Sequence, residues 1–77
     1  MDLQLNQFVR QKRKSLGLTQ KELSLKAGVG LRFIRELERG KLSLQMHKVN
    51  QVLKMFGYEL APVASDRNQL SRPHETG

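Results

Sequence analysis

Apolar side chains recur along this chain with the spacing of α-helices, and turn residues separate the stretches in which they do so. At about 100° per residue, apolar positions three or four residues apart share one face of a helix. The last stripe runs from Met46 to Phe56, so its helix is expected to begin between Leu44 and Met46 and to end before Gly57. This pattern predicts an all-α fold. The helices expected earlier in the chain cover residues 5–16, the segment between Thr19 and Gly28, and residues 30–39.

The second expected helix has clear boundary residues. Thr19 is placed to cap its first turn, and Glu22, three residues later, completes a capping box. Gly17 and Gly28 end the first and second helices, because glycine readily adopts the left-handed conformation that follows many helices. The turn over residues 27–30 is too short for two antiparallel helices. A steep crossing is therefore expected, as in a helix-turn-helix unit.

The third expected helix, closed by Gly40, is sharply two-sided. Phe33, Ile34 and Leu37 share one face, and charged side chains gather within about 100° on nearly the opposite face. A short basic helix with one buried face suits the major groove of DNA. For Phe33, packing beneath the second helix is favoured over contact with DNA. The charged face consists of Arg32, Arg35, Glu36 and Arg39.

The C-terminal part of the chain has a different character. Residues 58–63, YELAPV, are too short for a helix and read as an edge strand that contains Pro62. A lone strand in a helical domain has no partner within its own chain, so pairing with the same segment of a twofold-related subunit is expected. Residues 1–63 are thus predicted to form the domain and its dimerisation strand, and residues 64–77 a flexible polar tail.

The net charge of +7 is concentrated in the first half of the chain. Residues 1–41 hold ten Lys or Arg and four Asp or Glu, whereas residues 42–77 hold four and three. Such a surface attracts phosphate backbones, because each cation that neutralises a phosphate releases condensed counterions. A merely solvated basic face is the alternative. An anionic membrane surface is disfavoured, since no helix pairs a broad apolar face with a lysine-rich one.

Other functional classes find little support in the composition. There is no cysteine, and the two histidines, His47 and His74, are far apart, so neither a metal site nor a cofactor is expected. Carboxylates are scattered over helix surfaces, which argues against an enzyme. Four aromatic residues without grouping offer no stacking platform for RNA. No stretch is apolar and long enough to span a membrane or to act as a secretion signal, so a cytoplasmic protein is expected.

The run from Leu18 to Gly40, followed by the amphipathic fourth helix, resembles the Cro and lambda-repressor-like helix-turn-helix family. The linked features are the GLTQ of residues 17–20, the AGV of residues 27–29, Ile34 and Leu37, and the ERG of residues 38–40, together with Arg13 and Leu23. The resemblance covers roughly residues 5–60. It implies a compact four-helix domain that binds double-stranded DNA.

Within that family the chain looks most like HipB-type antitoxins, through VGLRFIRELERGK and VNQVLKMFGYEL leading into APV. That resemblance implies an autorepressing homodimer that ends in a shared strand and binds a HipA-type kinase toxin. A free-standing phage-repressor-like regulator is the alternative. An interaction module that has lost DNA binding is another, because folds are reused.

The resemblance also implies roles for individual residues. Arg32 is the best candidate for a bidentate contact to guanine, and Leu31 offers an apolar contact to a thymine methyl group. Glu36 either accepts from cytosine N4 or pairs with Arg32 one helical turn away. Gly30 has no side chain with which to read a base, so DNA shape is expected to add specificity. The implied base-reading positions are Gly30, Leu31, Arg32 and Glu36.

Phosphate contacts are implied at the start of the second helix, where free backbone N–H groups also attract an anion, and after the third helix. Arg35 joins either group or remains a solvated charge. Arg13 and Glu38 occupy positions that form a structural ion pair in the family. The implied phosphate-binding residues are Thr19, Gln20, Arg35, Arg39, Lys41 and Ser43. The expected dimer interface is Phe56, Tyr58, Glu59, Leu60, Ala61, Pro62 and Val63, and a twofold dimer predicts a palindromic operator.

Overall fold

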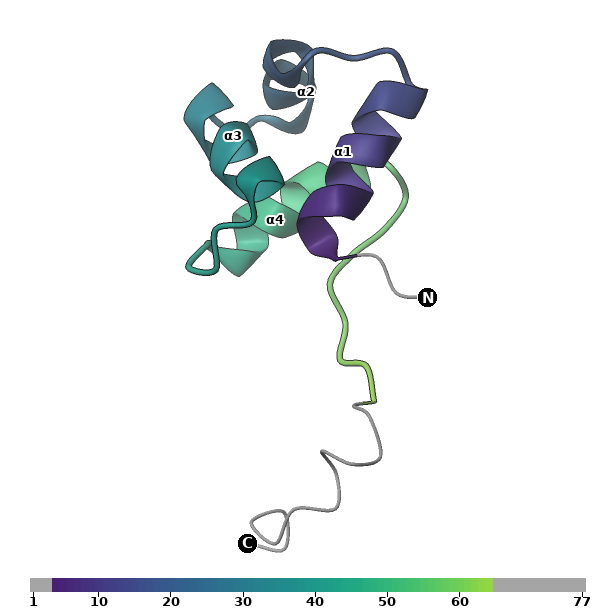
Figure 1. Ribbon diagram of the computed structural model, residues 1–77, viewed down its shortest axis with the longest axis vertical. Coiled ribbons are helices and arrows are strands. Elements are labelled where there is room, and N and C mark those ends of the chain that lie inside the picture. Colours follow the sequence, from purple (N-terminus) through teal and green to yellow (C-terminus); the bar gives the residue numbers. More distant parts are fainter. Residues whose placement is uncertain (1–3, 65–77) are drawn as a thin grey trace, which may run out of the picture.

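A computed structural model describes residues 4–64 and contains four α-helices (Figure 1). Their bounds are α1 Leu5–Ser15, α2 Gln20–Ala27, α3 Leu31–Arg39 and α4 Met46–Lys54. The all-α architecture and the order of helices expected from the apolar spacing are confirmed. The predicted bounds differ only by residues at the helix ends. Turns replace the last predicted residues of α1 and α4, and Gly30 is the N-cap of α3 and not its first helical residue.

Helix α1 ends one residue earlier than predicted. Leu16 caps it, and its backbone N–H donates to carbonyls of the last turn, while Gly17 follows with a φ of 70°. That last turn is basic, which suits the negative end of the helix dipole. The cations are Lys12, Arg13 and Lys14.

Helix α2 begins and ends at the predicted residues. The Glu22 N–H donates to Thr19 Oγ1 at 3.0 Å, and the Thr19 N–H donates back to Glu22 Oε1 at 2.8 Å, which completes the capping box. At the other end Gly28 has a φ of 75°, in the left-handed region that favours glycine. Both ends of α2 are therefore defined by local chemistry.

Helix α3 begins after Gly30, which is its N-cap, and is closed by Gly40 with a φ of 90°. Helix α4 begins at Met46 within the predicted interval, with Gln45 as its N-cap. It stops at Lys54 because Met55, Phe56 and Gly57 donate to carbonyls three residues back and so form turns.

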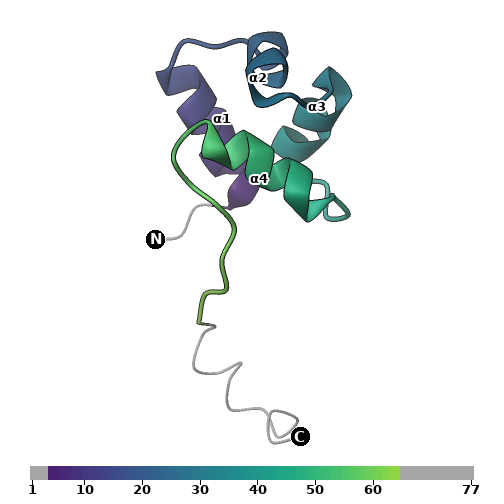
Figure 2. The same ribbon diagram turned by 180° about the vertical axis from the view of Figure 1, so that it is seen from behind.

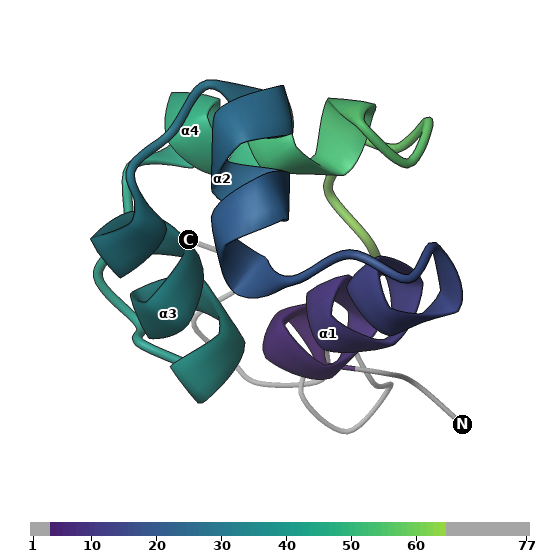
Figure 3. The same cartoon turned by 90° about the horizontal axis from the view of Figure 1, so that it is seen from above.

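The core lies where the four helices meet (Figure 3). Helix α3 contacts both α1 and α2, and α2 also contacts α4. Burial of apolar side chains between these helices is the main force that holds so small a domain together. The buried apolar residues are Val9, Leu23, Ala27, Ile34, Leu37, Val49, Val52 and Leu53.

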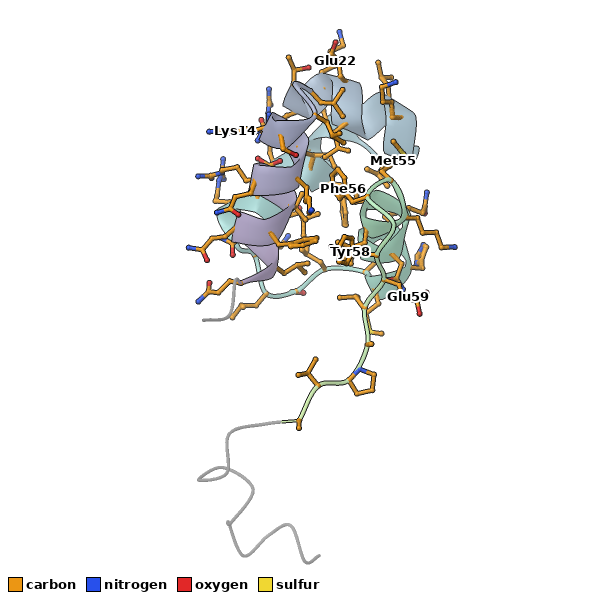
Figure 4. All side chains as sticks on the ribbon, turned by 90° about the vertical axis from the view of Figure 1, so that its right-hand side faces the viewer. Lys14, Glu22, Met55, Phe56, Tyr58 and Glu59 are labelled. Atoms are coloured by element: carbon orange, nitrogen blue, oxygen red, sulfur yellow. The ribbon has the colours of Figure 1, made fainter. Side chains whose placement is uncertain are left out.

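After α4 the chain turns back and passes α1 (Figure 2). The rings of Tyr58 and Phe8 on α1 form a T-shaped contact with centroids 4.8 Å apart, and the Leu60 N–H donates to Asn50 Oδ1 at 2.7 Å. Figure 4 shows Phe56 and Tyr58 between α1 and this segment. Within residues 4–64 no β-strand is present in the single chain. The strand expected over residues 58–63 needs a second chain to pair with, so it stays a prediction.

The division between a domain and a polar tail also stays a prediction, since residues 65–77 lie outside the described part of the chain. Across residues 4–64, no helix is long and apolar enough to cross a membrane.

Candidate nucleic-acid interface

Helix α3 has an exposed basic face and a buried apolar face. Ile34 and Leu37 are buried beneath it, whereas Arg32, Arg35 and Arg39 are exposed on its outer side. The buried face fixes the helix against α1 and α2, so the arginines extend from a rigid element. This is the arrangement that a helix needs in order to enter a groove of DNA.

The first turn of α3 offers little side chain for hydrogen bonding to bases. Gly30 is exposed, and a Cβ added there would meet no atom within 4 Å. Leu31 is half-buried, and Arg32, by contrast, has a side chain that is 91% exposed. Among the four predicted base-reading residues, Arg32 therefore extends furthest into solvent at the start of the helix.

Glu36 lies between Arg32, a predicted base-reading residue, and Lys41, a predicted phosphate-binding residue. Its Oε2 is 3.4 Å from Arg32 Nε and its Oε1 is 3.4 Å from Lys41 Nζ. The ion pair with Arg32, one of the two interpretations drawn from the sequence, is therefore present. The contact with Lys41 was not predicted, because it depends on how Gly40 turns the chain after α3.

The start of α2 is tied to the end of α3. The Gln20 side chain, a predicted phosphate contact, donates from Nε2 to Glu38 Oε1 at 3.1 Å. Its second N–H remains available for another acceptor. Thr19, also predicted to meet a phosphate, uses its hydroxyl oxygen to cap α2. Both residues thus have structural partners at the same end of the helix at which an anion is expected.

Arg13 and Glu38 form the ion pair that the family resemblance implied. The Glu38 side chain is 1% exposed, and the Arg13 guanidinium donates to both of its oxygens. Burial by itself raises the pKa of Glu38, but hydrogen bonds from Arg13 and Gln20 and the nearby positive charges outweigh it, so the pKa is lowered. The carboxylate therefore stays ionised inside the domain.

Two residues of this framework were missed by the sequence interpretation. Arg10 donates from Nη2 to the Glu38 carbonyl at 3.4 Å, and Gln51 donates from Nε2 to the carbonyls of Ala27 and Gly28 at 3.2 Å and 3.4 Å. Arg10 lies one turn before Arg13 on α1, so their spacing places both near Glu38. No local pattern marks Gln51, whose partners are more than twenty residues away.

Phe33 is half-buried and packs against the core. Lys48 Nζ on α4 is 6.0 Å from the centre of its ring, which places a cation over the ring face. These contacts favour the core interpretation of Phe33 over contact with DNA.

The loop after α3 carries the second predicted group of phosphate contacts. Arg39, Lys41 and Ser43 are all exposed on this side of the domain.

In the part of the chain that the structure covers, no group of three or more potential metal ligands is found.

Comparison with known proteins agrees with this geometry. A profile described as helix-turn-helix matches residues 9–63, which include most of α1 and all of α2, α3 and α4. The chain belongs to this helix-turn-helix family. Such motifs consist of two helices joined by a tight turn, and the second helix lies in the major groove. Within the matched residues, α2 and α3 are joined in this way by the turn at Gly28.

One relative is a protein of Sinorhizobium fredii (strain NBRC 101917 / NGR234) named uncharacterized HTH-type transcriptional regulator y4mF. The two sequences are 54% identical over 50 residues, which is 65% of this helix-turn-helix chain and 66% of that protein. The chain thus matches just under two thirds of the length of this relative.

Proposed function

We propose that this helix-turn-helix protein is a sequence-specific regulator of transcription that binds double-stranded DNA. The observation that carries the proposal is that α3 exposes several arginines on its outer face, while its opposite face is apolar and buried. The excess of cations in residues 1–41 supports it, because these residues contain α1, α2 and α3. The name of the relative as a transcriptional regulator points the same way.

Within the proposal, bases are read from α3 and phosphates are held at its two sides. Arg32 is assigned the main base contact, to guanine O6 and N7, and Leu31 the contact to a thymine methyl group. Gln20 and Thr19 at the start of α2 hold one phosphate, and Arg39, Lys41 and Ser43 after α3 hold another. Arg35 joins one of these groups.

The proposal is tested by selecting duplexes from a random pool with the full chain and measuring binding to the selected duplex by gel shift. The expected result is an enriched motif that is bound far more tightly than a scrambled duplex of the same composition, by a factor of about 10³ or more. Binding should weaken steeply as salt is raised. If the protein enriches no motif and binds no duplex at low salt, an interaction module without DNA binding becomes the better interpretation.

A more specific part of the proposal is that the protein forms a homodimer and binds a palindromic operator. The expected interface contains Phe56 and residues 58–63, which carry an exposed apolar surface: Tyr58 is 48% exposed and Val63 is 87% exposed. Together with Leu5 and Phe8 of α1, part of this segment lines a shallow, largely apolar hollow of about 460 Å³. A second copy that pairs its own segment here would remove this surface from water.

An antitoxin role is the further part of the proposal, and it rests on the resemblance to HipB-type proteins. In that role the protein represses its own operon and binds a HipA-type kinase toxin. A kinase-like reading frame directly downstream of the gene, whose product co-purifies with this chain, would support the role. Absence of such a reading frame favours a free-standing phage-repressor-like regulator in the cytoplasm.

A further inference from the structure

Glu36 is the acidic side chain among the exposed arginines of α3, and both of its oxygens face cations. Arg32 Nε and Lys41 Nζ each lie 3.4 Å from one of them. The Glu36 side chain is only 25% exposed, whereas those of Arg32 and Lys41 are 91% and 47% exposed. The Glu36 side chain is therefore the most shielded from solvent of the three.

Lys41 is tied to Glu36 by its backbone as well. The Lys41 N–H donates to the Glu36 carbonyl at 3.1 Å, in the turn where Gly40 has a φ of 90°. Arg32 is one helical turn before Glu36 on the same rigid helix. The three side chains thus link the first turn of α3, where bases are read, to the loop after α3, where a phosphate is held.

The contact of Arg32 with Glu36 is compatible with base reading. A guanidinium has five N–H donors, and an ion pair through Nε leaves the edge formed by Nη1 and Nη2 free. That edge provides the two parallel donors that guanine O6 and N7 accept. A carboxylate beside Nε limits the rotation of the planar group and so aligns the free edge before DNA arrives.

We infer that Glu36 is a positioning residue for DNA recognition: it holds Arg32 for a base contact and restrains Lys41, and it does not read a base itself. This inference rests on the proposed DNA-binding function. It also gives the negative charge of Glu36 a second effect, since a carboxylate on a DNA-facing helix weakens attraction to every phosphate and so lowers binding to unrelated sequences.

The test uses the full chain, the duplex that the wild type selects from a random pool, and a scrambled duplex of the same composition. The readouts are the ratio of the two Kd values and the dependence of each Kd on salt. Glu36→Gln is expected to bind the scrambled duplex more tightly and with a steeper salt dependence, because the negative charge that opposes binding of phosphates is removed. The Kd ratio should fall by more than about twofold, and by no more than in Arg32→Ala, which removes the base contact itself and should lower the ratio at least about fivefold.

A double-mutant cycle separates positioning from direct reading. If Glu36 acts through Arg32, Glu36→Gln should change the Kd ratio less than about twofold when Arg32→Ala is already present. Arg35→Ala is the matched control, because Arg35 is an exposed arginine of the same helix. It should weaken binding to both duplexes by the same factor. Circular dichroism melting curves should show that all variants fold.

The opposing results are distinct. Independent losses of specificity from Glu36→Gln and Arg32→Ala that multiply would make Glu36 a base-reading residue. A Kd ratio unchanged in Glu36→Gln would make it a solvated surface charge. A wild-type protein that binds no duplex at all would overturn the proposed function itself, and this inference with it.

Discussion

The guanidinium of Arg13 lies edge to edge with the carboxylate of Glu38, with Nε 2.7 Å from Oε2 and Nη2 3.0 Å from Oε1. The third nitrogen, Nη1, donates to the Leu18 carbonyl at 2.8 Å, and Gln20 donates to the same carboxylate. This one pair therefore connects α1, the loop before α2, the first turn of α2 and the last turn of α3. It sets the position of the proposed recognition helix relative to the rest of the domain.

Replacing Glu38 should destabilise the fold before it affects base preference. Glu38→Ala leaves the Arg13 side chain, which is 12% exposed, without its counter-ion, and loss of one partner of a buried pair costs about 3–5 kcal/mol. The free energy of unfolding is measured by urea denaturation at fixed protein concentration. Lys21→Ala, which removes an exposed charge outside the proposed dimer interface, is the control and should change it by less than about 0.5 kcal/mol. Equal effects of the two variants would show that the buried pair contributes no more than a surface charge.

The same carboxylate should make stability depend on acid. The pKa of Glu38 is lower in the folded chain than in the unfolded chain, so the unfolded state binds a proton first as the pH falls. The stabilisation is complete above the ordinary pKa of a glutamate and is lost as the pH falls through the lowered pKa of the folded state. Unfolding free energies measured between about pH 5 and pH 2 at constant ionic strength should therefore decrease toward low pH.

Gln20→Ala provides a milder variant for that experiment. It removes one donor to the Glu38 carboxylate, so the pKa of Glu38 in the folded chain should rise. The loss of stability on acidification should therefore be smaller than in the wild type and should end at a higher pH. Some acid dependence will remain in any Glu38 variant, because hydrogen bonds from Thr19 also lower the pKa of Glu22. If the free energy of unfolding of Gln20→Ala depended on pH in the same way as that of the wild type, Gln20 would not contribute to the low pKa of Glu38.

The parts of the fold that the sequence predicted are those decided by neighbouring residues. Thr19 and Glu22 are three positions apart, and Gly28 follows its helix directly, so their capping chemistry is visible in the sequence. The pair of Arg32 and Glu36 is likewise local, at one helical turn. The predicted end of α1 differed from the structure by one residue, since short turns compete with the last helical hydrogen bonds.

Contacts between distant segments were not predicted from spacing. Gln51 meets the end of α2 only because α4 packs against it, and Lys41 reaches Glu36 only through the turn at Gly40. The ion pair of Arg13 with Glu38 spans 25 residues, and it was expected from family resemblance alone. The strand over residues 58–63 depends on a second chain, so a single chain neither confirms nor contradicts it.

The cap of α2 should contribute to stability independently of DNA. Thr19→Ala removes the hydroxyl oxygen that accepts the Glu22 N–H at 3.0 Å and should lower the free energy of unfolding by about 1 kcal/mol. Thr19→Ser keeps that oxygen and is the matched control. If both variants melt at the same temperature as the wild type, the capping box does not limit stability. A loss of DNA affinity in Thr19→Ser alone would instead assign the threonine methyl group a part in binding.

The exposed arginines of α3 should determine how binding depends on salt. Removing one phosphate-binding cation should reduce the slope of log K against log salt concentration by about 0.9. Arg35 and Arg39 replaced together by alanine should therefore flatten the slope by up to about 1.8 if both bind phosphate. Lys54→Ala removes an exposed cation from the end of α4, outside the proposed interface, and should leave the slope unchanged. An unaltered slope in the double variant would place both arginines outside the interface.

Tyr58 should be needed for dimerisation. One side of its ring is held by Phe8, and Lys12 Nζ is 5.4 Å from its centre, yet the residue is still 48% exposed and so available to a second copy. Tyr58→Ala should shift the protein toward monomer in sedimentation experiments at micromolar concentration. Leu42→Ala, at a fully exposed leucine in the loop after α3, is the control and should leave the association unchanged.

Loss of the dimer should also change how the protein binds DNA. A dimer places two recognition helices about 34 Å apart, one turn of the duplex, so that both half-sites of a palindrome are bound at once. For Tyr58→Ala, binding to the full palindrome should fall toward that for a single half-site, because the second recognition helix is no longer linked to the first. Mutation of one half-site should then weaken binding much less in this variant than in the wild type. A wild-type protein that is monomeric both free and on DNA would contradict the dimer, and the preference for a palindrome would have to come from two independent molecules.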